Sequence, residues 1–121
     1  MKQIVATLTL LLFSSIALAD NCDSTRTTFD DVYCTNKLYA DADHELNQNY
    51  QKLRGLLNTE QKTTLKRSQL AWIRSRDAQC VEGNSIDVGC RLSTTQDRNT
   101  WLRERLRECK TVGCMNRRLN D

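Results

Sequence analysis

The chain contains no proline, only four glycines among its 121 residues, and a single histidine, His44. A β-sandwich or β-barrel of this size would need more turn residues and more alternation of apolar and polar positions, so these fold classes are disfavoured. No Cys-x-x-Cys motif and no glycine-rich phosphate loop occur, and His44 has no cysteine at ligand spacing. The sequence therefore disfavours a zinc site, a thiol redox centre and a phosphate-loop enzyme. We expect no cofactor and no metal.

The chain also lacks a strong excess of charge, since 18 lysines and arginines face 15 acids for a net charge of +3. This is too little for a typical nucleic-acid-binding protein. The charge is nevertheless uneven, with acids in excess up to Glu60 and bases in excess from Arg91 onward. A solvated helix face with local ion pairs explains the basic part, and a phosphate-rich or membrane-surface partner is the alternative.

The longest apolar run is short and lies at the N-terminus, at residues 8–13. Lys2 precedes this run, and Ala17-Leu18-Ala19 follows it directly before Asp20. A charged start, a short apolar stretch and a small-x-small site are typical of a secretory signal peptide, here residues 1–19. The run is too short to span a bilayer. We expect a periplasmic or secreted protein without a membrane anchor.

Six cysteines follow the expected leader, and an even number in a short exported chain indicates disulfides. They are Cys22, Cys34, Cys80, Cys90, Cys109 and Cys114. We expect Cys34 to pair with Cys80, because both lie in phase with inner helix stripes at the same end of an antiparallel hairpin. Cys109 and Cys114 are close enough to pair locally, which leaves Cys22 with Cys90. The sequence also permits other connectivities.

Apolar residues recur at helical spacing in three segments, which predicts an all-α fold. A first helix over residues 31–57 carries an inner stripe of Leu38, Ala42, Leu46, Tyr50, Leu53 and Leu57. Asn58 and Gln61 have the spacing of a capping box at the start of a second helix. Its inner stripe is Leu65, Gln69, Trp72, Arg76 and Cys80. A third helix is expected from Ser93 or Thr94, with Leu102, Leu106 and Cys109 on one face.

Short connections predict a small antiparallel helical hairpin plus a third helix, stapled by disulfides, with the first two helices running side by side. We expect one helical domain over residues 20–108. Residues 109–121 are expected to form a basic C-terminal tail outside this domain, with a local disulfide.

Two segments together are distinctive enough to suggest a family. The first carries Asp43, Leu46, Asn47 and Tyr50, and the second carries Leu65, Gln69, Trp72, Arg76, Asp77 and Cys80. With Cys90, Thr95, Arg98 and Leu102, this pattern resembles the LprI-like lysozyme-inhibitor domain of bacterial envelope proteins, from Cys22 to about Leu106. The loop after Cys80 is shorter than we expect for that family. The resemblance implies a protein that binds and inhibits lysozyme.

The motif also has a purely structural interpretation. Asp43 and Arg76 lie on facing inner stripes, so we expect an ion pair between them. Asn47 and Gln69 could satisfy each other or backbone groups at the same interface, and Trp72 offers a large apolar surface for burial. We expect these residues, with Tyr50 and Asp77, to hold the fold together; direct binding of a partner is the alternative.

The types and spacing of the polar residues disfavour an enzyme. His44 stands alone beside Asp43 and Glu45, without a nucleophile and an orienting group at suggestive spacing. The pair Asp43-His44 is similar to the histidine–aspartate pair of secreted phospholipases, but the calcium-binding glycine loop of those enzymes is missing.

A protruding loop between Cys80 and Cys90 is the best candidate for an inhibitory surface, because rigidity lowers the cost of ordering on binding. Its polar residues Glu82, Asn84, Ser85 and Asp87, with Ile86, could enter an enzyme cleft. A simple connecting loop is the alternative. Lysozymes are often basic, so the acidic face of the first helix, with Asp30, Asp31, Asp41 and Glu45, is the next candidate. The expected partner is lysozyme or another cell-wall hydrolase; an envelope accessory or immunity-type protein is the alternative.

Overall fold

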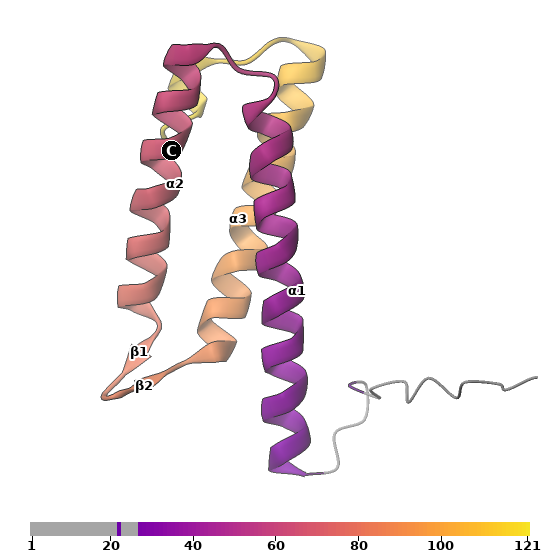
Figure 1. Ribbon diagram of the computed structural model, residues 1–121, viewed down its shortest axis with the longest axis vertical. Coiled ribbons are helices and arrows are strands. Elements are labelled where there is room, and N and C mark those ends of the chain that lie inside the picture. Colours follow the sequence, from indigo (N-terminus) through magenta and orange to yellow (C-terminus); the bar gives the residue numbers. More distant parts are fainter. Residues whose placement is uncertain (1–21, 23–26) are drawn as a thin grey trace, which may run out of the picture.

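The computed structural model describes Cys22 and residues 27–121, so the expected signal peptide lies outside the described residues. Three long helices dominate the chain, and a two-stranded hairpin joins the second helix to the third (Figure 1). The elements are α1 (Thr28–Arg54), α2 (Thr59–Gln79), β1 (Val81–Glu82), β2 (Ser85–Ile86), α3 (Val88–Thr111) and a 3-10 helix η1 (Asn116–Arg118). The predicted all-α class is confirmed. No helix of the described part is long and apolar enough to cross a membrane.

Side-chain caps fix where the first two helices begin. Thr27 Oγ1 accepts a hydrogen bond from the main-chain N–H of Asp30 at 3.1 Å, at the start of α1. At the start of α2, Asn58 Oδ1 accepts from the Gln61 N–H at 2.8 Å, and Gln61 Oε1 accepts from the Asn58 N–H at 3.0 Å. The predicted capping box is thus confirmed, and it ends the turn after Gly55.

The third helix begins earlier than predicted, at Val88 instead of Ser93 or Thr94. Its cap is Asp87, whose carboxylate accepts from the main-chain N–H of Cys90 at 3.0 Å. Asp is as good an N-cap residue as Ser or Thr, so a usable signal was present in the loop.

The antiparallel pair α1 and α2 is present, with α3 beside it, but the closest pair of helices is α1 with α3. Figure 1 shows α1 and α3 running in the same direction, with α2 opposed to both. Small side chains explain the close approach: Asn49 Nδ2 donates to Asn99 Oδ1 at 3.1 Å, and Asn99 Nδ2 donates to the Ala42 carbonyl at 2.9 Å. The expectation that the first two helices run side by side is therefore wrong, because α3 lies against α1 and is also the helix nearest to α2.

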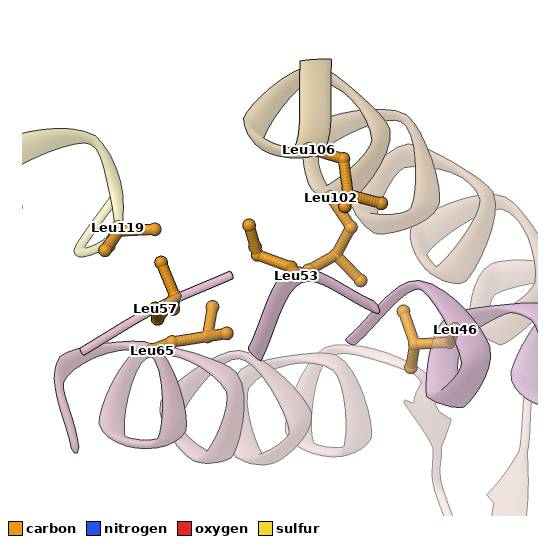
Figure 2. Packing of buried hydrophobic residues seen from close by; sticks show 7 residues of the cluster. All are labelled: Leu46, Leu53, Leu57, Leu65, Leu102, Leu106 and Leu119. Atoms are coloured by element: carbon orange, nitrogen blue, oxygen red, sulfur yellow. The ribbon is translucent and has the colours of Figure 1, made fainter. Parts of the chain in front are cut away.

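One cluster of leucines forms the core at the end of the molecule where α1 turns into α2 (Figure 2). All its members are less than a tenth exposed, and Tyr50, Trp72 and Trp101 pack against it. The cluster consists of Leu46, Leu53, Leu57, Leu65, Leu102, Leu106 and Leu119. Leu38 was predicted on the inner stripe, but it is exposed, whereas Cys34 and Ala42, one turn before and after it, are buried.

Each disulfide joins cysteines that are near one another in sequence. The pairs are Cys22–Cys34, Cys80–Cys90 and Cys109–Cys114. The prediction for Cys109–Cys114 is confirmed, and the predictions of Cys34–Cys80 and Cys22–Cys90 are wrong. They assumed that α1 and α2 stay adjacent along their whole length, whereas the hairpin returns Cys90 to the end of α2, beside Cys80. The disulfides therefore close short segments of the chain, and Cys80–Cys90 joins the end of α2 to the first turn of α3.

The C-terminal segment packs on the helices, because Leu119 is only 1% exposed and belongs to the core. Gln61 Nε2 donates to Asn116 Oδ1 at 2.8 Å, which ties the segment to α2. The domain boundary at residue 108 stays a prediction, but residues 109–121 contribute to the same core.

Candidate functional site

A short β-hairpin projects from the end of the molecule opposite the turn between α1 and α2 (Figure 1). Val81 pairs with Ile86 and Glu82 with Ser85, and Gly83 makes the turn with φ of +62°, a conformation that favours glycine. At its base, the Asp87 N–H donates to the Cys80 carbonyl at 2.9 Å, above the Cys80–Cys90 disulfide. The hairpin is thus held at both ends and preorganised.

A groove of about 430 Å³ lies between this hairpin and the first turns of α1. Asp31, Val32, Thr35 and Asn36 form the α1 side, where the spacing of three and four residues places them on one helix face. The opposite side is formed by Glu82, Ile86, Asp87, Val88 and Gly89. We call these nine residues the hairpin groove.

The hairpin groove combines negative charge with apolar surface. Its carboxylates are Asp31, Glu82 and Asp87, and no lysine or arginine is among its lining residues. Val32 and Ile86 are 56% and 55% exposed, so they place apolar surface beside the carboxylates of the groove. Such a surface suits a partner that presents a lysine or arginine, whose aliphatic stem packs on the valine and isoleucine while its charge meets the carboxylates.

The structure brings together some of the residues predicted for the site. Glu82 and Asp87 line the hairpin groove, whereas Ser85 lies on the hairpin but outside the groove. On α1, Asp41 is exposed and does not line the groove. The carboxylate of Glu45 forms an intramolecular ion pair with Arg103 of α3. Glu45 therefore links two helices and is a poorer candidate for binding.

Sequence reasoning missed the α1 side of the hairpin groove. Asp31 is among the acidic residues predicted for binding, whereas Val32, Thr35 and Asn36 were not predicted for this surface. A signal existed, since Val32 lies outside the apolar stripe of the helix, where an exposed valine has no partner to cover it. The missing information was which face of the first turns of α1 lies toward the hairpin.

Away from the groove, arginines and aromatic rings alternate in a stack across the three helices. The guanidinium of Arg98 lies 3.8 Å from the ring centre of Trp101 and 5.7 Å from that of Trp72. The order of the stack is Tyr39, Arg76, Trp72, Arg98, Trp101 and Arg105. These long side chains fill the space between α2 and α3, which keeps those helices further apart than α1 and α3.

Arg98 lies between Trp72 and Trp101 in this stack. The sequence did not predict that it is buried. It is 5% exposed and donates to Gln69 Oε1 at 3.0 Å, to Ser68 Oγ at 2.9 Å and to the main-chain oxygen of Asp121 at 3.1 Å. Burial lowers the pKa of Arg98 to about 10, and the charge of Arg105 adds to the effect. The guanidinium stays protonated at neutral pH.

The motif residues have partners within the molecule, as the structural interpretation expects. The predicted pair of Asp43 and Arg76 is confirmed, with Oδ1 and Nη1 3.6 Å apart. Asp77 also contacts Arg76, at 3.0 Å, and reaches Arg91 at 3.5 Å. Of the two alternatives for Asn47 and Gln69, a contact with each other is not found, because Asn47 is exposed and Gln69 Oε1 accepts from Arg98. These contacts favour a structural role for most of the motif.

Metal-binding clusters are not found in the described part of the chain. No cluster of three or more histidine, cysteine or acidic side chains there could hold a metal ion. His44 is exposed, and its Nε2 lies 3.1 Å from the side-chain amide of Gln48. The carboxylates and apolar side chains of the hairpin groove suit binding of a basic partner.

Comparison with known proteins agrees with the resemblance in the sequence. Searches of curated proteins and of solved structures found no match. The family described as lysozyme inhibitor LprI matches residues 19–102, a region that contains both motif segments and the hairpin. Because this match covers well over half of the chain, the protein belongs to the LprI lysozyme inhibitor family.

Proposed function

We propose that this protein is a periplasmic or secreted inhibitor that binds a lysozyme-type, peptidoglycan-cleaving enzyme and blocks its activity. Membership of the lysozyme inhibitor family supports the class of partner. Three disulfides and a leader-like N-terminus support export, because disulfides persist in oxidising compartments. The protein acts by binding and not by catalysis.

The hairpin groove is the proposed inhibitory surface, and its composition is the observation that carries this proposal. Asp31, Glu82 and Asp87 surround apolar side chains at one exposed end of the molecule. A basic enzyme is attracted to such a surface, and association should slow as salt screens the charges.

Preorganisation gives the hairpin an advantage over a free loop. The pairing of β1 with β2 and the Cys80–Cys90 disulfide fix the backbone before binding, so little conformational entropy is lost in the complex. The projecting hairpin also allows contact with a concave enzyme surface while the helices stay outside it.

A panel of lysozymes tests the proposed function. The exported protein, with its N-terminus checked at Asp20 by intact mass, is titrated into lysozymes of several classes while lysis of cell-wall substrate is followed. We expect stoichiometric inhibition of at least one class, weakening as salt is raised from 50 to about 300 mM. Absence of inhibition across all classes would contradict the proposal and favour an accessory or immunity-type protein with another partner.

A further inference from the structure

The end of the molecule opposite the hairpin groove carries several cations, with Glu60 in the first turn of α2 as an exposed carboxylate near them. Arg54, Lys62 and Lys66 line a shallow pocket of about 190 Å³ together with the hydroxyl-bearing Thr59 and Thr63. Lys110 and Arg117 lie at the end of α3 and in η1, at the same end of Figure 1. Within residues 27–121, none of these five cations has an ion pair, whereas Arg105 and Arg118 are paired with Glu108.

Apolar side chains protrude among these cations. Leu56, Val112 and Met115 are 47%, 71% and 37% exposed, and all three belong to the connections at this end. The disulfide sulfur of Cys114 lies 3.8 Å from the Leu56 carbonyl oxygen, and Arg117 Nη2 lies 4.0 Å from the Met115 sulfur. The turn after α1 and the segment after α3 therefore form one surface, held by the Cys109–Cys114 disulfide. We call these five cations and three apolar residues the basic end.

We propose that the basic end adsorbs reversibly onto an anionic lipid surface. Cations attract acidic headgroups, and the pocket of Arg54, Lys62 and Lys66 suits a single phosphate group. The exposed leucine, valine and methionine then enter the interface, as apolar residues of peripheral proteins do. A soluble anionic polymer would satisfy the cations but would leave the apolar side chains in water, which favours the membrane as partner. Adsorption at this end leaves the hairpin groove facing away from the membrane.

Vesicle co-sedimentation of the exported protein tests the proposal, with residues 1–19 shown by mass to be absent. We expect binding to phosphatidylglycerol-containing vesicles, weak binding to pure phosphatidylcholine vesicles, and loss of binding at high salt. Lys66→Glu should weaken binding about tenfold, since each basic residue at a membrane surface contributes a several-fold gain. Arg74→Glu is the matched control, because Arg74 is exposed on the same helix, away from the basic end.

The apolar contribution is tested with Leu56→Ser and Val112→Ser, with Leu70→Ser on the middle of α2 as control. We expect the first two variants to lose binding to anionic vesicles and the control to keep it, with melting unchanged in all three. Equal binding to neutral and anionic vesicles would overturn the proposal, as would equal losses for Lys66→Glu and Arg74→Glu. Retention on a heparin column without vesicle binding would assign the basic end to an anionic polymer and also overturn it.

Discussion

Asp87 accepts a hydrogen bond from the main-chain N–H of Cys90 at 3.0 Å, at the point where the hairpin becomes α3. The same carboxylate lines the hairpin groove. One side chain therefore caps a helix and contributes to the proposed binding surface. Its two roles depend on different properties, since capping needs an oxygen acceptor whereas attraction of a basic partner needs negative charge.

Two substitutions separate these roles. Asp87→Ala should lower the free energy of unfolding by about 1 kcal/mol, because the cap is lost, and should weaken inhibition as well. Asp87→Asn keeps an acceptor, so it should melt within a few degrees of the wild type and yet inhibit less. Chemical denaturation and an inhibition assay measure both quantities. Full inhibition by Asp87→Asn would show that this charge plays no part in binding.

The ion pair of Asp43 with Arg76 should contribute less than a fully buried pair. The side chain of Arg76 is 7% exposed, but that of Asp43 is 43% exposed. Arg76 also keeps Asp77 as a partner when Asp43 is removed. We expect Asp43→Ala to cost about 1 kcal/mol and Arg76→Ala at least twice that, because Arg76 also packs against Trp72. Urea denaturation of both variants checks this order, and the reverse order would contradict it.

The buried amides of Asn49 and Asn99 set the contact between α1 and α3. Asn99→Ala leaves Asn49, only 6% exposed, without its long-range acceptor, so a loss of about 2 kcal/mol is expected. A double-mutant cycle with Asn49→Ala should reveal a coupling energy of about 1 kcal/mol. Additive losses would mean that the two amides act independently.

We expect the Cys80–Cys90 disulfide to support both stability and inhibition, and the Cys109–Cys114 disulfide to support stability alone. Cys80→Ser with Cys90→Ser opens the base of the hairpin, at a cost of about 3 kcal/mol by loop entropy, and should weaken inhibition even at temperatures where the helices stay folded. Cys109→Ser with Cys114→Ser should cost about 2 kcal/mol and leave inhibition intact. Melting followed by circular dichroism and an inhibition assay measure the two effects. Equal loss of inhibition in both double variants would contradict a special role for the hairpin.

Local features of the fold could be predicted because they depend on residues near one another in sequence. The capping box of Asn58 and Gln61, the helical stripe from Ala42 to Leu53 and the Cys109–Cys114 disulfide are of this kind, although α1 ends at Arg54 and not at the predicted residue 57. The start of α3 was missed although Asp87 carries the same kind of signal, because the loop was assigned as irregular up to Gly89.

Long-range features could not be predicted because they depend on the spacing between helices. Whether Cys34 reaches Cys80 is decided by how far α1 and α2 diverge. That divergence follows from Trp72, Arg98 and Trp101 lying between α2 and α3, and their stacking has no periodic signature. For the same reason, the α1 side of the hairpin groove emerged only from the arrangement of the helices.

If the hairpin groove is the inhibitory surface, a charge reversal combined with loss of an apolar contact in the groove should impair inhibition. Glu82→Lys with Ile86→Ser changes two exposed groove residues, and Glu60→Lys with Leu70→Ser makes matched changes on exposed positions of α2. The quantity to measure is the inhibition constant against the lysozyme that the wild type inhibits best, after equal melting temperatures have been verified. We predict at least a tenfold weaker inhibition for the groove variant and no change for the α2 variant. Undiminished inhibition by the groove variant would contradict the claim, and the surface around Asp41 would be the next to test.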